Sequence, residues 1–226
     1  MKIISIVEFG SSARMDNDEF SDKDYFLWVE KWEDRSKIIQ NVKNEFSFLN
    51  NNKCEFIIHD TNSFDFMLDK GSLFLWHLKL EAKPVYGKHD FLAKLSKLEQ
   101  FTRYTYKFEN YINVFYDLKE ARTQLPQITS FDYATMFTVI RNLCILVCFK
   151  IGSPKFGRTS AFLEVFNQFE KLSINKEDYD FLLNKKLEYE RGFILDSSDN
   201  SIDDLDIWIT KVDAFSSRIK TILKIG

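Results

Sequence analysis

A glycine-serine turn and two closely spaced aspartates near the start of the chain could bind phosphate and a metal ion. Gly10 and Ser11 follow an apolar run, and Asp22 and Asp24 come after residues 12–21. A glycine lets the backbone approach an anion closely, and the N–H groups at the start of a helix favour negative charge. Two residues apart on a strand, the carboxylates would share one face, roughly 6.6 Å apart along the chain, and could share one hard cation. This spacing is typical of a protein that handles a nucleoside triphosphate.

Alternating strand and helix signals surround these residues and must position them. The apolar run 3–7 predicts a buried strand that leads directly into the turn, and residues 24–29 predict a second strand. The full pattern predicts strands near 2–9, 23–30 and 53–59, with helices near 32–49, 61–69 and 71–82. Pro84 ends the last of these helices. We therefore expect residues 1–88 to form a mixed sheet with flanking helices.

From residue 89 onward the pattern becomes purely helical. Apolar and aromatic residues recur at helical spacing over 90–124, which predicts one long helix or two helices in line. Leu125 and Pro126 interrupt that pattern. Further helices are predicted near 130–151, 158–172, 176–191 and 202–224. The chain is thus expected to be α+β, with an all-α helical bundle over residues 89–226.

The N-terminal motif resembles that of the nucleotidyltransferase superfamily to which DNA polymerase beta belongs, especially its small bacterial and archaeal branch, the minimal nucleotidyltransferases. That family has Gly-Ser, a loop, and Asp-x-Asp on the next strand; residues 9–14 and 21–24 match this order. Residues 53–59 look like the third strand, which carries the last carboxylate, here Glu55. Residues 71–87 resemble the helix and short strand that close such domains. The resemblance extends to about residue 88.

This resemblance implies an enzyme that moves a nucleoside monophosphate from a triphosphate to an acceptor hydroxyl and releases pyrophosphate. It implies Mg²⁺ as cofactor, held between carboxylates and phosphate oxygens. Glu55 would orient or deprotonate the attacking hydroxyl. The implied catalytic and metal-binding residues are Asp22, Asp24 and Glu55, and the implied nucleotide-binding residues are Gly10, Ser11 and Arg14.

Several alternatives stay open at this stage. Glu55 stands where the family usually has an aspartate, so a noncatalytic nucleotide sensor or an antitoxin-like interaction module is the second hypothesis. The acceptor could be a small molecule, a protein or a nucleic-acid end, and a second copy of the chain or a toxin could be a partner. The helical half resembles HEPN domains in length and helicity. Arg141 is not followed by the histidine that HEPN ribonucleases use, so ribonuclease activity is not expected.

Composition favours a folded protein and argues against several classes. The chain has 226 residues, 45% of them hydrophobic and 16% aromatic, which predicts one large or two small domains with proper cores. The net charge of -3 gives no overall attraction to nucleic acid or an anionic membrane. The apolar run 143–149 is shorter than the roughly 20 residues of a membrane span. Glu8 interrupts the N-terminal apolar stretch, so we expect no signal peptide. Together with the short apolar runs and the net charge, this predicts no membrane partner and a cytoplasmic location.

Overall fold

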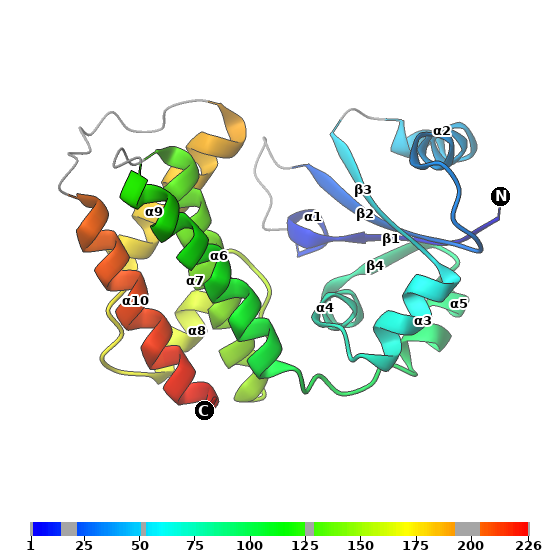
Figure 1. Cartoon of the computed structure of the whole chain (residues 1–226). Coiled ribbons are helices and arrows are strands. Elements are labelled where there is room, and N and C mark those ends of the chain that lie inside the picture. The colour runs from blue at the N-terminus through cyan, green and yellow to red at the C-terminus, as the bar shows by residue number, and fades with distance from the viewer. Residues whose placement is uncertain (1, 15–21, 51–52, 125–128, 193–203, 226) are drawn as a thin grey trace. The chain divides into compact units, whose positions relative to one another are not determined.

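The computed structural model describes residues 2–14, 22–50, 53–124, 129–192 and 204–225. The chain divides into two compact units, residues 1–102 and residues 103–226 (Figure 1). The first contains a mixed sheet with helices, and the second is helical. The expected α+β class is therefore confirmed.

Four strands form the sheet of the first unit, in the order β3-β2-β1-β4. Their bounds are β1 Ile3–Phe9, β2 Lys23–Val29, β3 Cys54–Asp60 and β4 Lys83–Tyr86. β1 pairs antiparallel with β2 and with β4, whereas β2 and β3 are parallel. In this register Phe9 lies opposite Asp24, and Asp24 lies opposite Glu55. The sheet therefore brings the end of the first strand and two carboxylates into one row.

Side chains alternate between the two faces of the sheet along each strand, and helices pack against both faces. Phe26 and Trp28 belong to the core that the sheet shares with helices α3 (Thr61–Asp69), α4 (Leu73–Glu81) and α5 (Lys88–Leu95). Leu27 and Val29 point to the opposite core, which α2 (Arg35–Glu45) covers. Asp24 has the same parity as Phe26, so it lies on the α3–α4–α5 side of the sheet.

Two of the predicted helical stretches are interrupted in the structure. The helix expected over 32–49 is α2, followed by a single 3₁₀ turn at Ser47–Leu49. Asp34 caps the start of α2, and its carboxylate accepts a hydrogen bond from the Lys37 N–H. The stretch 90–124 forms two helices, α5 and α6 (Tyr104–Gln124). Phe91 of α5 is buried against the sheet. The first unit therefore extends to Thr102, beyond the boundary expected at residue 88.

The second unit is built around one central helix, α7 (Ser130–Lys150), which contacts the four other helices that the structure describes there. These are α6, α8 (Ser160–Gln168), α9 (Lys176–Arg191) and α10 (Asp204–Leu223). Among the helices that the structure describes, α7 alone is long and apolar enough to cross a membrane. However, 72% of its most apolar stretch is buried inside the protein, as in the core helix of a bundle.

Candidate active site

Gly10 brings the first turn against an aspartate of the next strand. It stands where β1 passes into the short helix α1 (Gly10–Arg14) and has φ of +73°, in the left-handed region that favours glycine. A Cβ atom at this position would lie only 2.5 Å from Oδ2 of Asp24. Because Gly10 has no side chain, the Asp24 carboxylate can lie directly beside the turn. Ser11 follows and is half-buried.

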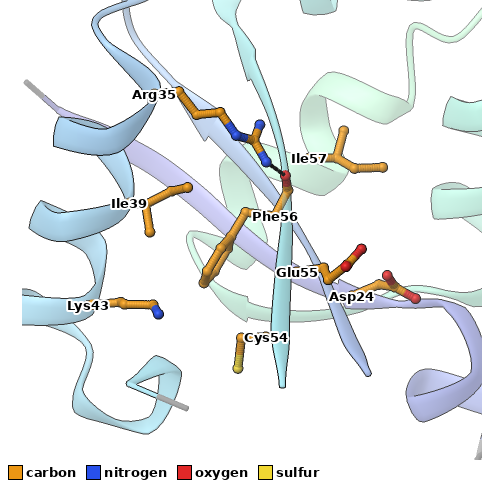
Figure 2. A pocket seen from close by; sticks show the side chains of 8 residues that line it. All are labelled: Asp24, Arg35, Ile39, Lys43, Cys54, Glu55, Phe56 and Ile57. Carbon is orange, nitrogen blue, oxygen red and sulfur yellow. Dashed lines mark hydrogen bonds between the residues drawn. The ribbon is translucent and has the colours of Figure 1, made fainter. Parts of the chain in front are cut away.

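Asp24 and Glu55 are cross-strand neighbours on the same face of the sheet. They are register partners in the parallel β2–β3 pair, and Asp24 is half-buried while Glu55 is exposed. Figure 2 shows both side chains pointing away from Phe56, to the same side of the strands. Two neighbouring carboxylates repel each other unless a proton or a cation compensates their charge. The pair is therefore suited to bind a hard cation.

Asp22 differs in position from these two carboxylates. The sequence pattern placed it on a strand, but β2 begins at Lys23, and Asp22 is exposed just ahead of it. Within the described ranges, no three His, Cys, Asp or Glu side chains are grouped closely enough to hold a metal ion. Mg²⁺ commonly takes one or two carboxylates from a protein and completes its shell with phosphate and water. The Asp24–Glu55 pair fits that requirement; residues 15–21 of the motif's loop lie outside the described residues.

Arg14 is held by two side chains that sequence reasoning missed. Its Nη1 lies 2.7 Å from Oε2 of Glu81, and Nε2 of His77 lies 3.1 Å from the same oxygen. The three side chains are 19%, 17% and 14% exposed for Arg14, Glu81 and His77, respectively. His77 and Glu81 stand four residues apart on α4, the spacing that places two side chains on one helix face. That spacing is visible in the sequence, but their contact with α1 is not.

The ionisation of Glu81 reflects this cluster. Burial raises the pKa of the Glu81 carboxyl, but hydrogen bonds from His77 and Arg14, together with their charges, outweigh it and leave the pKa below its ordinary value of 4.5. A carboxylate with a lowered pKa in the folded state stabilises the fold above its unfolded pKa. This contribution is lost as the pH falls through the lowered folded pKa.

Glu81→Gln should therefore remove a pH-dependent part of the stability. At pH 7 we expect the free energy of unfolding to fall by about 1–3 kcal/mol, because charge-assisted hydrogen bonds are lost. The gap from the natural protein should narrow as the pH falls below 4.5, where Glu81 becomes protonated. Urea unfolding at a series of pH values measures this. Glu190→Gln is the matched control, because the Lys186–Glu190 pair has the same spacing but its carboxylate is exposed. A gap that stays constant with pH would contradict the assignment.

Aromatic rings pack around His59, which lies on the same strand face as Glu55. The His59 ring centroid is 5.9 Å from that of Phe26 and 6.4 Å from that of Phe74. Burial lowers the pKa of His59, although the neighbouring Asp60 opposes the shift. His59 is thus a half-buried side chain whose imidazole is biased toward the neutral form.

A pocket of about 380 Å³ adjoins the carboxylate pair at β3 (Figure 2). Asp24 and Glu55 form part of its wall, and Arg35 and Lys43 of α2 form another part. The Arg35 guanidinium donates a hydrogen bond from Nη2 to the Phe56 carbonyl oxygen at 2.7 Å. The remaining lining residues are Ile39, Cys54, Phe56 and Ile57. Acidic and basic side chains therefore line a single hollow.

Comparison with known proteins supports the fold. No family model matches the chain, and no curated protein matches its sequence. Among solved structures, it is similar to spectinomycin adenyltransferase AAD(9) from Enterococcus faecialis, in a crystal structure with ATP and spectinomycin. The TM-score is 0.51 at 14% sequence identity, covering 96% of this chain and 92% of that one. The chain thus shares with a nucleotidyltransferase the fold of a mixed-sheet N-terminal region followed by a helical region.

Proposed function

We propose that this protein is a Mg²⁺-dependent nucleotidyltransferase that moves a nucleoside monophosphate from a triphosphate to an acceptor hydroxyl. The observation that carries the proposal is the position of the Asp24 carboxylate, beside the Gly10 turn and opposite Glu55 in the sheet. A site for phosphate and a site for its counter-ion are thereby adjacent. The fold shared with an adenyltransferase supports this combination.

Each residue has a defined task in the proposed reaction. The backbone N–H groups after Gly10 and the Ser11 hydroxyl bind phosphate oxygens, and Arg14 adds positive charge. Asp24 and Glu55, with Asp22 nearby in sequence, would hold Mg²⁺. When bound, the ion supplies neutralisation of the charge on the triphosphate oxygens. Phosphoryl chemistry of this kind depends mainly on positioning and charge neutralisation, which these side chains provide.

The proton balance of the reaction assigns a second task to Glu55. The acceptor oxygen forms a bond to the α-phosphorus, and the bond from that phosphorus to the bridging α–β oxygen breaks. Pyrophosphate leaves with the electron pair of that bond, and the acceptor's proton passes to the Glu55 carboxylate. Glu55 is exposed on β3, so an acceptor can reach it. ATP as donor and a small molecule as acceptor are the first choices, because the structural neighbour was crystallised with ATP and spectinomycin.

Transfer of label from each α-labelled nucleoside triphosphate, with Mg²⁺ and a cell lysate, tests the proposal. Label should appear in one acceptor class, separated as small molecules, protein or nucleic acid, with release of pyrophosphate. Glu55→Gln should lower transfer by about 10²–10⁴-fold, the usual contribution of a general base, while triphosphate binding remains. Glu109→Gln, on the exposed surface of α6, should leave transfer unchanged.

Two outcomes would decide against the enzyme. Triphosphate binding by the natural protein without pyrophosphate release would favour the noncatalytic sensor or antitoxin-like module instead. Failure to bind any triphosphate would reject both functions.

A further inference from the structure

The pocket at β3 lies on the outer side of the carboxylate pair. β3 is one of the two edge strands of the described sheet, and residues 54–57 of this strand line the pocket. Figure 2 shows Glu55 and Asp24 on one side of the strand and Phe56, Arg35 and Lys43 on the other. The hollow therefore wraps around the strand edge and is open to a ligand that reaches both sides. Its volume of about 380 Å³ suits a small molecule.

The order of residues across the sheet places this pocket at the end that is farther from the Gly10–Ser11 turn. The Gly10–Ser11 turn follows β1, Asp24 lies on β2, Glu55 lies on β3, and the pocket lies beyond. In a phosphoryl transfer, the attacking and leaving oxygens are roughly in line on opposite sides of phosphorus. If the triphosphate binds at the turn, an acceptor in this pocket meets Glu55 first. The pocket thus has the position required of an acceptor site.

Two cations of α2 set the charge of the far wall. Arg35 is fixed through its hydrogen bond to the Phe56 carbonyl oxygen, which uses one of the five N–H donors of the guanidinium. The Lys43 Nζ lies 6.0 Å from the centroid of the Phe56 ring. Both side chains line the pocket. A guanidinium and an ammonium in one small hollow favour a carboxylate or phosphate group.

We propose that the acceptor is a small molecule that carries an anionic group besides its hydroxyl. Arg35 and Lys43 bind the anionic group, and the hydroxyl lies beside Glu55. Asp24 and Glu55 would repel such a molecule from their own side of the strand, so the charges of the pocket also fix its orientation. This assignment rests on the proposed nucleotidyltransferase activity, and it adds the acceptor's class and two residues that select it.

Fractionation of natural acceptors tests whether the acceptor carries a negative charge. Small molecules from a lysate are separated on an anion-exchange column, and each fraction is incubated with the protein, labelled ATP and Mg²⁺. Acceptor activity should appear in the retained, anionic fractions. Phosphatase treatment of the active fraction, followed by heat inactivation of the phosphatase, should abolish acceptor activity for a phosphate and spare it for a carboxylate. Acceptor activity confined to the unretained fraction would overturn the proposal.

Substitution of the two cations tests the residues. For the active fraction, Arg35→Gln with Lys43→Gln should raise the acceptor KM by about 10–100-fold, the effect of losing charge-assisted hydrogen bonds, with kcat and the KM for ATP nearly unchanged. Lys37→Gln, on the same helix but outside the pocket lining, is the control. The Lys43→Gln single variant keeps the Arg35 hydrogen bond to Phe56 and guards against misfolding of the double variant. An unchanged acceptor KM in folded variants would overturn the assignment.

The two proposals fail in different ways. If the natural protein transfers no label to any fraction, the nucleotidyltransferase function fails, and the acceptor assignment fails with it. If label is transferred but only to uncharged or cationic acceptors, the nucleotidyltransferase function stands and the anionic acceptor is rejected.

Discussion

Replacing Asp24 by asparagine should reduce nucleotide transfer by about 100-fold or more. Asparagine has nearly the same shape as aspartate, so the Gly10 turn can still pack against it. The substitution removes one of two negative charges that face each other across β2 and β3. Loss of residues that merely support metal ligands already costs about 10–100-fold in affinity or activity, and a carboxylate that holds the ion directly should cost at least as much.

Transfer rates at several Mg²⁺ concentrations measure this effect. The variant should need more Mg²⁺ for triphosphate binding, and raising the Mg²⁺ concentration should restore part of that binding. Asp69→Asn, exposed at the end of α3, serves as the matched control and should behave as the natural protein. Thermal unfolding without metal establishes that the variant is folded. Unaltered transfer in a folded Asp24→Asn variant would remove Asp24 from the proposed site.

The sequence predicts the elements of the first unit well because their signals are local. The apolar run before Gly10 and the alternation after Asp24 each define a strand within a few residues, and β1 and β2 occur as predicted. Asp22 lies one residue ahead of β2, and a period-two argument applies only inside a strand. Spacing alone therefore does not fix where the Asp22 side chain lies relative to Asp24.

Other features depend on tertiary contacts that periodicity does not encode. Phe91 and Phe108 both fit one helical pattern, yet Phe91 is buried in the sheet core of the first unit, while Phe108 belongs to the helical second unit. The break between α5 and α6 follows from this difference. Likewise, Arg14 and Glu81 are 67 residues apart in the chain, and only the folded sheet brings their helices together. Arg35 and Lys43 resemble ordinary surface cations of an amphipathic helix until β3 is placed beside them.

Gly10→Ala should be the most damaging single-methyl change near the site. Alanine at φ of +73° costs about 1–2 kcal/mol of stability by itself. The added Cβ would also lie 2.5 Å from Asp24 Oδ2, far inside the contact distance. The Asp24 carboxylate or the turn must therefore move, and the phosphate site separates from the carboxylate pair. Displacements of about 1 Å can cost on the order of 100-fold in rate, so we expect a loss of transfer of at least that size.

Gly152→Ala separates the two causes of this loss. Gly152 also has positive φ, +78°, but a Cβ there would meet no atom within 4 Å. It should therefore show a similar backbone cost with transfer unchanged, whereas Gly10→Ala should lose both stability and transfer. Thermal unfolding and single-turnover transfer, measured on both variants, make the comparison. Equal transfer by the two variants would mean that the contact between Gly10 and Asp24 has no part in the reaction. Loss of transfer by Gly10→Ala alone would show that the turn must lie against this carboxylate, because backbone strain is common to both variants.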